Sequence, residues 1–559
     1  MRVGNTRLVV PIAMMATILV AGCSSFAYRN KKLEATNPPP TTRATFAIDG
    51  KRGNPKVLMF LALSGGGSRA AYLSGAAMLK LQHVFPDLDL LSEVDVISSV
   101  SGGSMAGAYY AVTQDESKTA PGLPTGTGVV EVAKDTSETS SNGIEPSPSK
   151  HPAHRLRKWS ELEVKDRMRR DYVVRWIGNW LWPANVAKYW FTSYDRSDIM
   201  AQTLADNLFD EPLSGIDYTL SDMNSERPYL ILNATNATGR DEQDIKRAPF
   251  GTVFTFTTDD FREYLSSDLS QYPLGWAVMA SSAFPFVFPE VTLRDFDHNK
   301  SICQDSGRSS REKLVQTDDQ MHIERLACPD RRYLHVFDGG NSDNLGLKSV
   351  KRALLQLALD EKLKDYDYVI VFLVDAFTVP QGASPWKADP RGFLGRLFDP
   401  NVTDAVDSLL QANRLTELAE FQRGELNWVR ECPDGAGGDF PSALCRRLST
   451  MNQNTVSQTL LEKMVFYHFG FDDVRDLPNR DQIDRVLGHD LFERLNRIPT
   501  SFRISAEHAG LLDKAVEYVL TPDNPCLTLM RKIMLKQPMD FVKERKNCIA
   551  SDQVEKKTQ

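Results

Sequence analysis

Short apolar runs alternate with glycine-rich turns and amphipathic stretches along the first two thirds of the chain. The run KVLMFLAL from Lys56 has the length of a buried strand, and a glycine turn joins it to an alanine-rich stretch in helical register. A second such unit places a strand at Val94–Val100 and a helix at Ser104–Val112. Further strands are expected at three apolar runs, Tyr229–Asn233, Tyr333–Phe337 and Tyr368–Val374, with a helix from Gly346 to Leu359. Strands that alternate with helices predict an α/β fold.

Changes in composition divide the rest of the chain. Residues 114–154 are rich in Thr, Ser, Pro, Gly and Glu and lack apolar periodicity, which predicts a disordered insertion. After about residue 380 the pattern becomes mainly helical, for example at Ala405–Phe421 and Ala509–Leu520. We therefore expect a main α/β domain over residues 56–380 and a mainly helical region over residues 381–559.

The N-terminus has the pattern of an export signal. Within residues 1–23, two arginines precede an apolar stretch that is too short to span a bilayer comfortably. The Ala-Gly-Cys ending resembles a bacterial lipobox, which implies a lipid on Cys23. The serine that follows implies sorting to the outer membrane, facing the periplasm. An ordinary signal peptide with an incidental cysteine is the alternative. The polar, proline-bearing residues 24–55 predict a disordered tether.

The charge and the cysteines narrow the class of protein. The net charge of -7 argues against nucleic-acid binding. Besides Cys23, six cysteines remain, an even number that suits local disulfides in an oxidising compartment. They cluster in three neighbouring pairs: Cys303 with Cys328, Cys432 with Cys445, and Cys526 with Cys548. Buried free thiols are the alternative to these pairings. No metal-ligand spacing is present, so no metal or cofactor is expected.

The stretch DVISSVSGGSMAG, residues 95–107, contains the candidate nucleophile. A serine nucleophile on a sharp turn between strand and helix needs small residues two positions before and after it, usually as G-x-S-x-G. Ser101 follows the apolar run at the point where the strand ends, and Ser99 is small enough to replace the first glycine. In the overlapping frame, Ser104 is expected to cap the helix. Ser101 is therefore the predicted nucleophile.

Two other strand ends carry candidate chemistry. In SGGGSR, residues 64–69, three glycines would let backbone N–H groups approach an anion at a helix N-terminus. Asp338 begins DGGNSDNLG after an apolar strand, where a general base is well placed, although a simple turn is the alternative. Asp375, at another strand end, and His335, within a strand, are rival bases.

Together, SGGGSR, SVSGG and DGG resemble the patatin-like phospholipase family and, more distantly, the cytosolic phospholipase A2 catalytic domain. NATNATG (residues 233–239) and ASSAFPFVFPEV (residues 280–291) look like further family blocks. The resemblance covers Lys56 to about Ala376 and does not include the C-terminal region. It implies a patatin-like catalytic domain, with a three-layer α/β/α sheet and a nucleophile elbow.

The resemblance also implies a Ser-Asp dyad. Ser101 would attack an ester carbonyl, Asp338 would accept its proton, and water would later hydrolyse the acyl-enzyme. The implied oxyanion hole, with an arginine that orders its loop or counters charge, consists of these residues: Gly65, Gly66, Gly67, Arg69 and Gly102.

We expect a lipid-anchored serine hydrolase of phospholipids or related acyl esters, of phospholipase A or lysophospholipase type, at the bacterial envelope. A non-catalytic lipid-binding or scaffold lipoprotein with the same fold is the alternative. Residues 155–191 hold five of the eight tryptophans among basic side chains, which suits a membrane interface. Two helices that pack tryptophans against the core would show the same composition.

Overall fold

The structure is a computed structural model. It describes residues 28–34, 53–115, 157–209, 217–238, 250–285, 287–296, 310–317, 320–327, 333–378, 401–424, 426–432, 439–449 and 460–553. The predicted signal sequence with Cys23, nearly all of the predicted insertion, and Cys303 and Cys328 lie outside these residues. Within the described ranges, no helix combines the length and the apolarity needed to cross a membrane.

A mixed sheet of eight strands forms the centre of the molecule, in the order β14-β13-β2-β3-β6-β12-β9, with β7 also paired to β6. Its strands are β2 (Val57–Leu63), β3 (Val96–Val100), β6 (Tyr229–Asn236), β7 (Val253–Phe256), β9 (Val291–Arg294), β12 (Tyr333–Asp338), β13 (Tyr368–Val374) and β14 (Met464–Phe469). Neighbours from β14 to β6 run parallel, whereas β12 and β7 run antiparallel to the strands they pair with. The strands expected from the apolar runs are all present.

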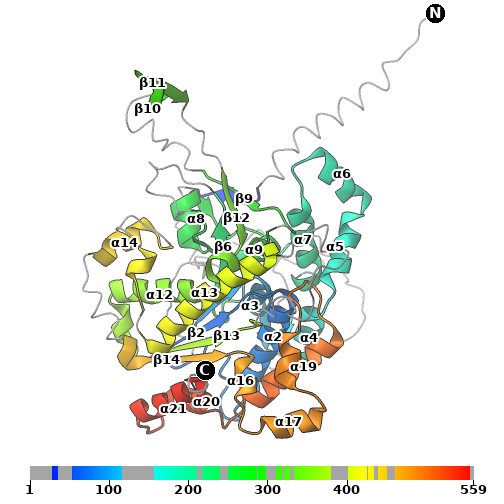
Figure 1. Cartoon of the computed structure of the whole chain (residues 1–559), viewed down its shortest axis with the longest axis vertical. Coiled ribbons are helices and arrows are strands. Elements are labelled where there is room, and N and C mark those ends of the chain that lie inside the picture. Colours follow the sequence, from blue (N-terminus) through cyan, green and yellow to red (C-terminus); the bar gives the residue numbers. More distant parts are fainter. Residues whose placement is uncertain are drawn as a thin grey trace, which may run out of the picture.

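Helices cover both faces of this sheet, as Figure 1 shows. Alternate residues of β2 point to opposite faces, so that Met59 and Leu61 enter one apolar core while Leu58 and Phe60 enter the other. The first core is closed mainly by α2 (Gly67–His83), α3 (Gly102–Ala111), α4 (Glu161–Met168), α7 (Arg196–Leu204), α8 (Thr258–Leu265), α9 (Leu274–Ser281), α16 (Asp472–Arg475), α17 (Arg480–Leu487), α18 (Leu491–Asn496), α19 (Ala506–Val519) and α20 (Pro525–Met534). The second is closed by α12 (Leu347–Leu359), α13 (Asn401–Arg423) and α14 (Ser442–Ser449). The predicted three-layer α/β/α arrangement is confirmed.

The C-terminal region is mainly helical, as expected, but it also completes the sheet. Strand β14 pairs in parallel with β13 along its whole length, although no strand was predicted after residue 380. The last helix, α21 (Phe541–Gln553), is tied to α20 by the disulfide Cys526–Cys548. A second disulfide joins Cys432 to Cys445. Two of the three predicted pairings are thus confirmed, and the third lies outside the described residues.

Residues 28–34, predicted as part of a disordered tether, are instead packed on the main domain. Strand β1 (Lys31–Lys32) pairs with β8 (Ser267–Asp268). The Asn30 amide group exchanges hydrogen bonds with the backbone of Arg294, at 2.8 Å each way. The tether prediction is wrong here because polar side chains can hold a segment on the domain through hydrogen bonds to backbone groups. Hydrogen bonds of this kind require no apolar pattern in the sequence.

Several shorter elements lie outside the central sheet. Strand β4 (Thr113–Asp115) pairs with β5 (Arg157–Trp159), and β10 (Ser310–Thr317) pairs with β11 (Gln320–Ala327). Two helices, α5 (Tyr172–Trp180) and α6 (Pro183–Phe191), form a hairpin at the outer edge in Figure 1. The short helix α11 (Gly340–Asp343) follows β12.

Candidate active site

The turn between β3 and α3 holds Ser101 in a strained conformation. The strand ends at Val100 and the helix begins at Gly102, so that Ser101 alone makes the turn, with φ 49° and ψ -119°. Positive φ values are costly for a residue with a side chain and persist where the surrounding structure enforces them. Such a sharp elbow presents the serine side chain beyond the end of the sheet.

Small residues around this turn allow three backbone segments to meet. A Cβ atom at Gly102 would overlap the carbonyl oxygen of Gly67, and one at Gly103 would lie 2.6 Å from that of Leu63. Ser99, where the usual signature has glycine, is fully buried and directs its hydroxyl to the carbonyl oxygen of Ile231 at 3.2 Å. The elbow therefore accommodates a serine at this position with a hydrogen bond to a neighbouring strand.

Ser101 and Asp338 form a hydrogen-bonded pair. The Oγ atom of Ser101 donates to Oδ2 of Asp338 at 3.0 Å, and the N–H group of Gly340 donates to Oδ1 at 2.7 Å. Burial raises the pKa of the Asp338 carboxyl to about 6, although both hydrogen bonds act to lower it. A carboxylate with a pKa near neutrality and a serine proton within reach is suited to general-base chemistry.

Two further serines, Ser281 and Ser104, lie next to the elbow and form hydrogen bonds around it. Ser281, at the end of α9, accepts a hydrogen bond from the backbone N–H of Ser101 at 3.0 Å and donates one to the carbonyl oxygen of Asn233 at 2.6 Å. The Ser104 hydroxyl lies 2.9 Å from that of Ser281 and is fully buried. The prediction that Ser104 caps the helix is wrong, because α3 begins two residues earlier and Ser104 lies inside its first turn.

The glycine loop after β2 faces the elbow and has backbone N–H groups available. Gly65 donates its N–H to the carbonyl oxygen of Asn344 at 2.9 Å, and Ser68 donates to that of Ser501 at 2.7 Å. Gly67 and Gly102 are the first residues of their helices, where backbone N–H groups have no partner within the helix. Gly66, with φ 139°, adopts a conformation reserved for glycine. Of the predicted oxyanion residues, Gly65 therefore shapes the loop, whereas Gly66, Gly67 and Gly102 can present donors to an oxyanion.

The Arg69 side chain holds this loop in place through hydrogen bonds to backbone carbonyl groups of other segments. Its Nε donates to the carbonyl oxygen of Ala376 at 2.8 Å, just after β13, and its Nη1 donates to that of Ile498. The side chain is 4% exposed. The predicted loop-ordering role agrees with these contacts of the buried guanidinium to backbone carbonyl groups.

A segment of the C-terminal region, residues 498–503, lies directly on the glycine loop. It supplies the carbonyl acceptors for Arg69 and Ser68, and a Cβ atom at Gly67 would overlap the carbonyl oxygen of Ser501. Sequence reasoning missed this segment, as it missed Ser281 and Asn344. Their contacts join residues that lie far apart in the chain, so no local sequence pattern indicates that these residues contact the glycine loop or the elbow.

The two rival bases occupy other environments. Asp375 is fully buried against Arg414 at 2.7 Å and His468 at 3.1 Å. Burial would raise the pKa of Asp375, but the two cationic partners hold it well below its usual range, which suits an ion pair and not a base. His335 lies three residues before Asp338 on β12, so that the two side chains point to opposite faces of the strand. Its Nδ1 lies 3.1 Å from the Thr292 hydroxyl.

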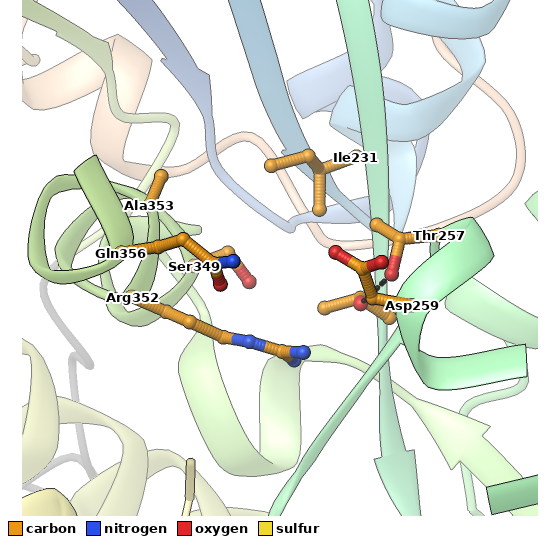
Figure 2. A pocket seen from close by; sticks show the side chains of 8 residues that line it. Ile231, Thr257, Asp259, Ser349, Arg352, Ala353 and Gln356 are labelled. Atoms are coloured by element: carbon orange, nitrogen blue, oxygen red, sulfur yellow. Dashed lines mark hydrogen bonds between the residues drawn. The ribbon is translucent and has the colours of Figure 1, made fainter. Parts of the chain in front are cut away.

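A pocket between α12 and β7, shown in Figure 2, is lined by neither residue of the dyad. Arg352 points from α12 toward Asp259 across it, and Ile231 and Thr257 line the opposite side. Its space of about 20 Å³ for water-sized groups holds little more than one water molecule, so an acyl chain does not fit. Among the described residues, no group of three or more His, Cys, Asp and Glu side chains is arranged to hold a metal ion.

The site therefore combines a serine at a strained turn, a buried carboxylate that can take its proton, and backbone donors beside both. This set is suited to attack on a carbonyl carbon, followed by stabilisation of the oxyanion that forms.

Comparisons with known proteins identify a family and a solved structure to which the chain is similar. A family model described as patatin-like phospholipase matches residues 61–350, which is more than half of the chain. No curated protein matches the chain. Among solved structures, human GIVD cytosolic phospholipase A2 is similar at 11% identity and a TM-score of 0.38. That match covers 94% of this chain and 66% of the human protein, so the chain spans about two thirds of its length.

Proposed function

The chain belongs to the patatin-like phospholipase family, a family of lipid-hydrolysing esterases, and from this premise we propose that it cleaves phospholipid or related acyl esters through a Ser101–Asp338 dyad. The family match agrees with the resemblance expected from the sequence. The observation that carries the proposal is the hydrogen bond from Ser101 Oγ to Asp338 Oδ2, 3.0 Å long, at an elbow with positive φ.

In the proposed reaction, the Ser101 oxygen attacks the ester carbonyl carbon while its proton passes to Asp338. The carbonyl oxygen becomes an oxyanion, which the N–H groups of Gly66, Gly67 and Gly102 would bind. One such donor typically contributes about 3 kcal/mol to the transition state. Asp338 then gives its proton to the departing alcohol, leaving an acyl ester on Ser101. Water, deprotonated by Asp338, releases the fatty acid and restores the serine.

The experiment that tests this proposal measures fatty acid release from phospholipid and lysophospholipid by the wild type, Ser101→Ala and Asp338→Asn. Both variants are expected to lose at least about 1,000-fold in rate, because nucleophile and base act as a unit. Ser104→Ala is the matched control, since it removes a buried hydroxyl 2.9 Å from Ser281 without touching the dyad. If the wild type releases no fatty acid, the protein is a non-catalytic lipid-binding or scaffold protein instead.

We also propose that Cys23 carries a lipid that anchors the protein to the outer membrane, facing the periplasm, with the tryptophan-rich residues 155–191 as a further membrane contact. The support is the apolar stretch before Cys23 and the small residues next to it. Two disulfides agree with an oxidising compartment. Labelled palmitate should enter the wild type and not Cys23→Ala; equal incorporation in both would refute the anchor.

A further inference from the structure

The hairpin of α5 and α6 exposes a cluster of large apolar side chains. Among the described residues, fifteen such side chains are exposed, and six of them lie in one stretch of the hairpin: Val174, Ile177, Leu181, Trp182, Trp190 and Phe191. Helix α6 buries none of its residues, and α5 buries only Tyr172. Trp190 of α6 and Trp182, which precedes this helix, are therefore not core residues, unlike Trp159, which is 2% exposed. A cluster of this kind marks a surface that binds a partner.

This apolar surface belongs to a well-fixed part of the fold. Helix α5 is bound to α7 through hydrogen bonds from Trp176 Nε1 to the Arg196 carbonyl oxygen, at 3.2 Å, and from Asn179 to Thr203, at 2.9 Å. Helix α6 is tied back to α5 by Asn185, whose amide donates to the carbonyl oxygen of Asn179 at 2.8 Å. The hairpin lies at the outer edge of the molecule (Figure 1), and its apolar side chains are exposed there.

The chemistry of the hairpin suits the surface of a bilayer. Residues 172–191 contain Arg175 and Lys188 and no acidic residue, so that the segment is positively charged. Exposed indole rings with basic side chains beside them bind where acyl chains meet anionic head groups. The fractional exposures of Trp182 and Trp190, 64% and 73%, leave both rings free to enter this zone.

A row of aromatic rings joins this surface to the active site. Starting near the C-terminal end of α6, successive rings lie 5.3 to 5.7 Å apart between centroids in the order Trp190, Tyr189, Trp180, Trp176, Phe288, Phe502. Phe502 follows Ser501, whose carbonyl oxygen accepts the Ser68 N–H of the glycine loop. The apolar path from the hairpin therefore ends beside the predicted oxyanion hole, which favours a substrate-bearing membrane over a protein as the partner.

The docked N-terminal segment lies on the same side of the molecule. Tyr28 and Arg29 line one pocket together with Ser193 and Asp195, which immediately follow α6. Tyr28 is the fifth residue after Cys23. An extended chain of that length spans at most about 18 Å. A lipid on Cys23 would hold a bilayer within that distance of the segment next to the hairpin.

We propose that the α5–α6 hairpin is the surface by which this protein docks on an anionic phospholipid bilayer, oriented by the packed segment 28–34. The inference rests on the proposed lipid-hydrolysing function and specifies how that site meets its substrate. Docking brings the exposed apolar side chains of the hairpin against the bilayer, on the side of the molecule from which the aromatic row leads to the segment that contacts the glycine loop.

The test uses vesicles of phosphatidylglycerol and phosphatidylcholine with full-length proteins that all carry Cys23→Ala, so that no lipid anchor contributes. The hairpin variant is Trp182→Ser with Trp190→Ser. The matched control is Val486→Ser with Val542→Ser, which removes side chains that are 75% and 63% exposed on α17 and α21, far from the hairpin (Figure 1). Binding is read from co-flotation over a series of lipid concentrations.

The hairpin variant is expected to need about tenfold more lipid, or more, for half-maximal binding, while the control binds like its parent. Both should hydrolyse a soluble short-chain ester at the parent rate, because the dyad is unchanged. Equal vesicle binding by parent and hairpin variant would overturn the proposal. The proposal would also be overturned if the parent protein does not bind vesicles but forms a dimer, and the hairpin variant does not form this dimer. Ser101→Ala should bind vesicles normally, so failure of catalysis alone leaves this test intact.

Discussion

Replacing Asp338 with asparagine is expected to inactivate the protein and stabilise its fold. Burial raises the pKa of Asp338 from 3.8 to about 6 in the folded protein, despite the hydrogen bonds from Gly340 and Ser101. One pKa unit corresponds to about 1.4 kcal/mol, so the charged carboxylate disfavours the folded state by about 3 kcal/mol well above pH 6. Below about pH 4 the group is protonated in both folded and unfolded chains, and this cost disappears.

The measurement is urea or thermal unfolding of wild type and Asp338→Asn at pH 8, 6 and 4. The variant should be more stable by up to about 3 kcal/mol at pH 8, and its advantage should shrink as the pH falls through 6. The decisive quantity is the change with pH in the stability difference between the variant and the wild type. Any effect of the asparagine amide that does not depend on pH cancels when the differences at two pH values are compared. A stability difference that is the same at pH 8 and pH 4 would refute the reasoning that Asp338 is a buried, destabilising base.

Asp375→Asn provides a control of opposite sign. Because Arg414 and His468 hold the pKa of Asp375 below its usual range, its charge favours the folded state at neutral pH. Removing it leaves the Arg414 guanidinium buried without this partner, which should destabilise the protein by about 3 kcal/mol or more. Asp338 and Asp375 each lie at the end of a strand of the same sheet. Substitution by asparagine should thus stabilise the folded protein at position 338 and destabilise it at position 375.

Three further predictions follow from the site. Because Asp338 must be ionised to act as a base, kcat/KM for a soluble ester should fall about tenfold between pH 7 and pH 5; a flat profile would exclude this base. Gly67→Ala should lower kcat at least about 100-fold without unfolding the protein, as circular dichroism would verify, since its Cβ overlaps the Ser501 carbonyl oxygen beside the oxyanion hole. Ser281→Ala should lower kcat about tenfold at unchanged KM because Ser101 loses the acceptor for its N–H; a change in KM alone would contradict this role.

The parts of the fold that sequence patterns predict are those set by local physical chemistry. An apolar run followed by small residues specifies a strand, a sharp turn and a helix, which places Ser101 at the turn. Asp338 is predictable for the same reason, because it ends an apolar strand and precedes two glycines. The capping role predicted for Ser104 is wrong because glycines at positions 102 and 103 allow α3 to begin before this serine.

The parts that sequence patterns miss depend on contacts between distant segments. The Ser501 carbonyl oxygen, the Ser281 hydroxyl and strand β14 each meet the site or the sheet from far along the chain. A carbonyl acceptor can come from any residue type, so nothing in the residue at position 501 signals its role. Ser281 lies in a block that the family resemblance identified, yet its hydrogen bond to the elbow emerges only from the fold.

The central claim is that Ser101 is the nucleophile and Asp338 its base. Labelling with a fluorophosphonate, followed by mass spectrometric mapping of the modified peptide, tests it most directly. The wild type and Ser104→Ala should carry the label on Ser101, Ser101→Ala should carry none, and Asp338→Asn should react far more slowly. A label on Ser104, or labelling of Ser101→Ala at the wild-type rate, would contradict the account.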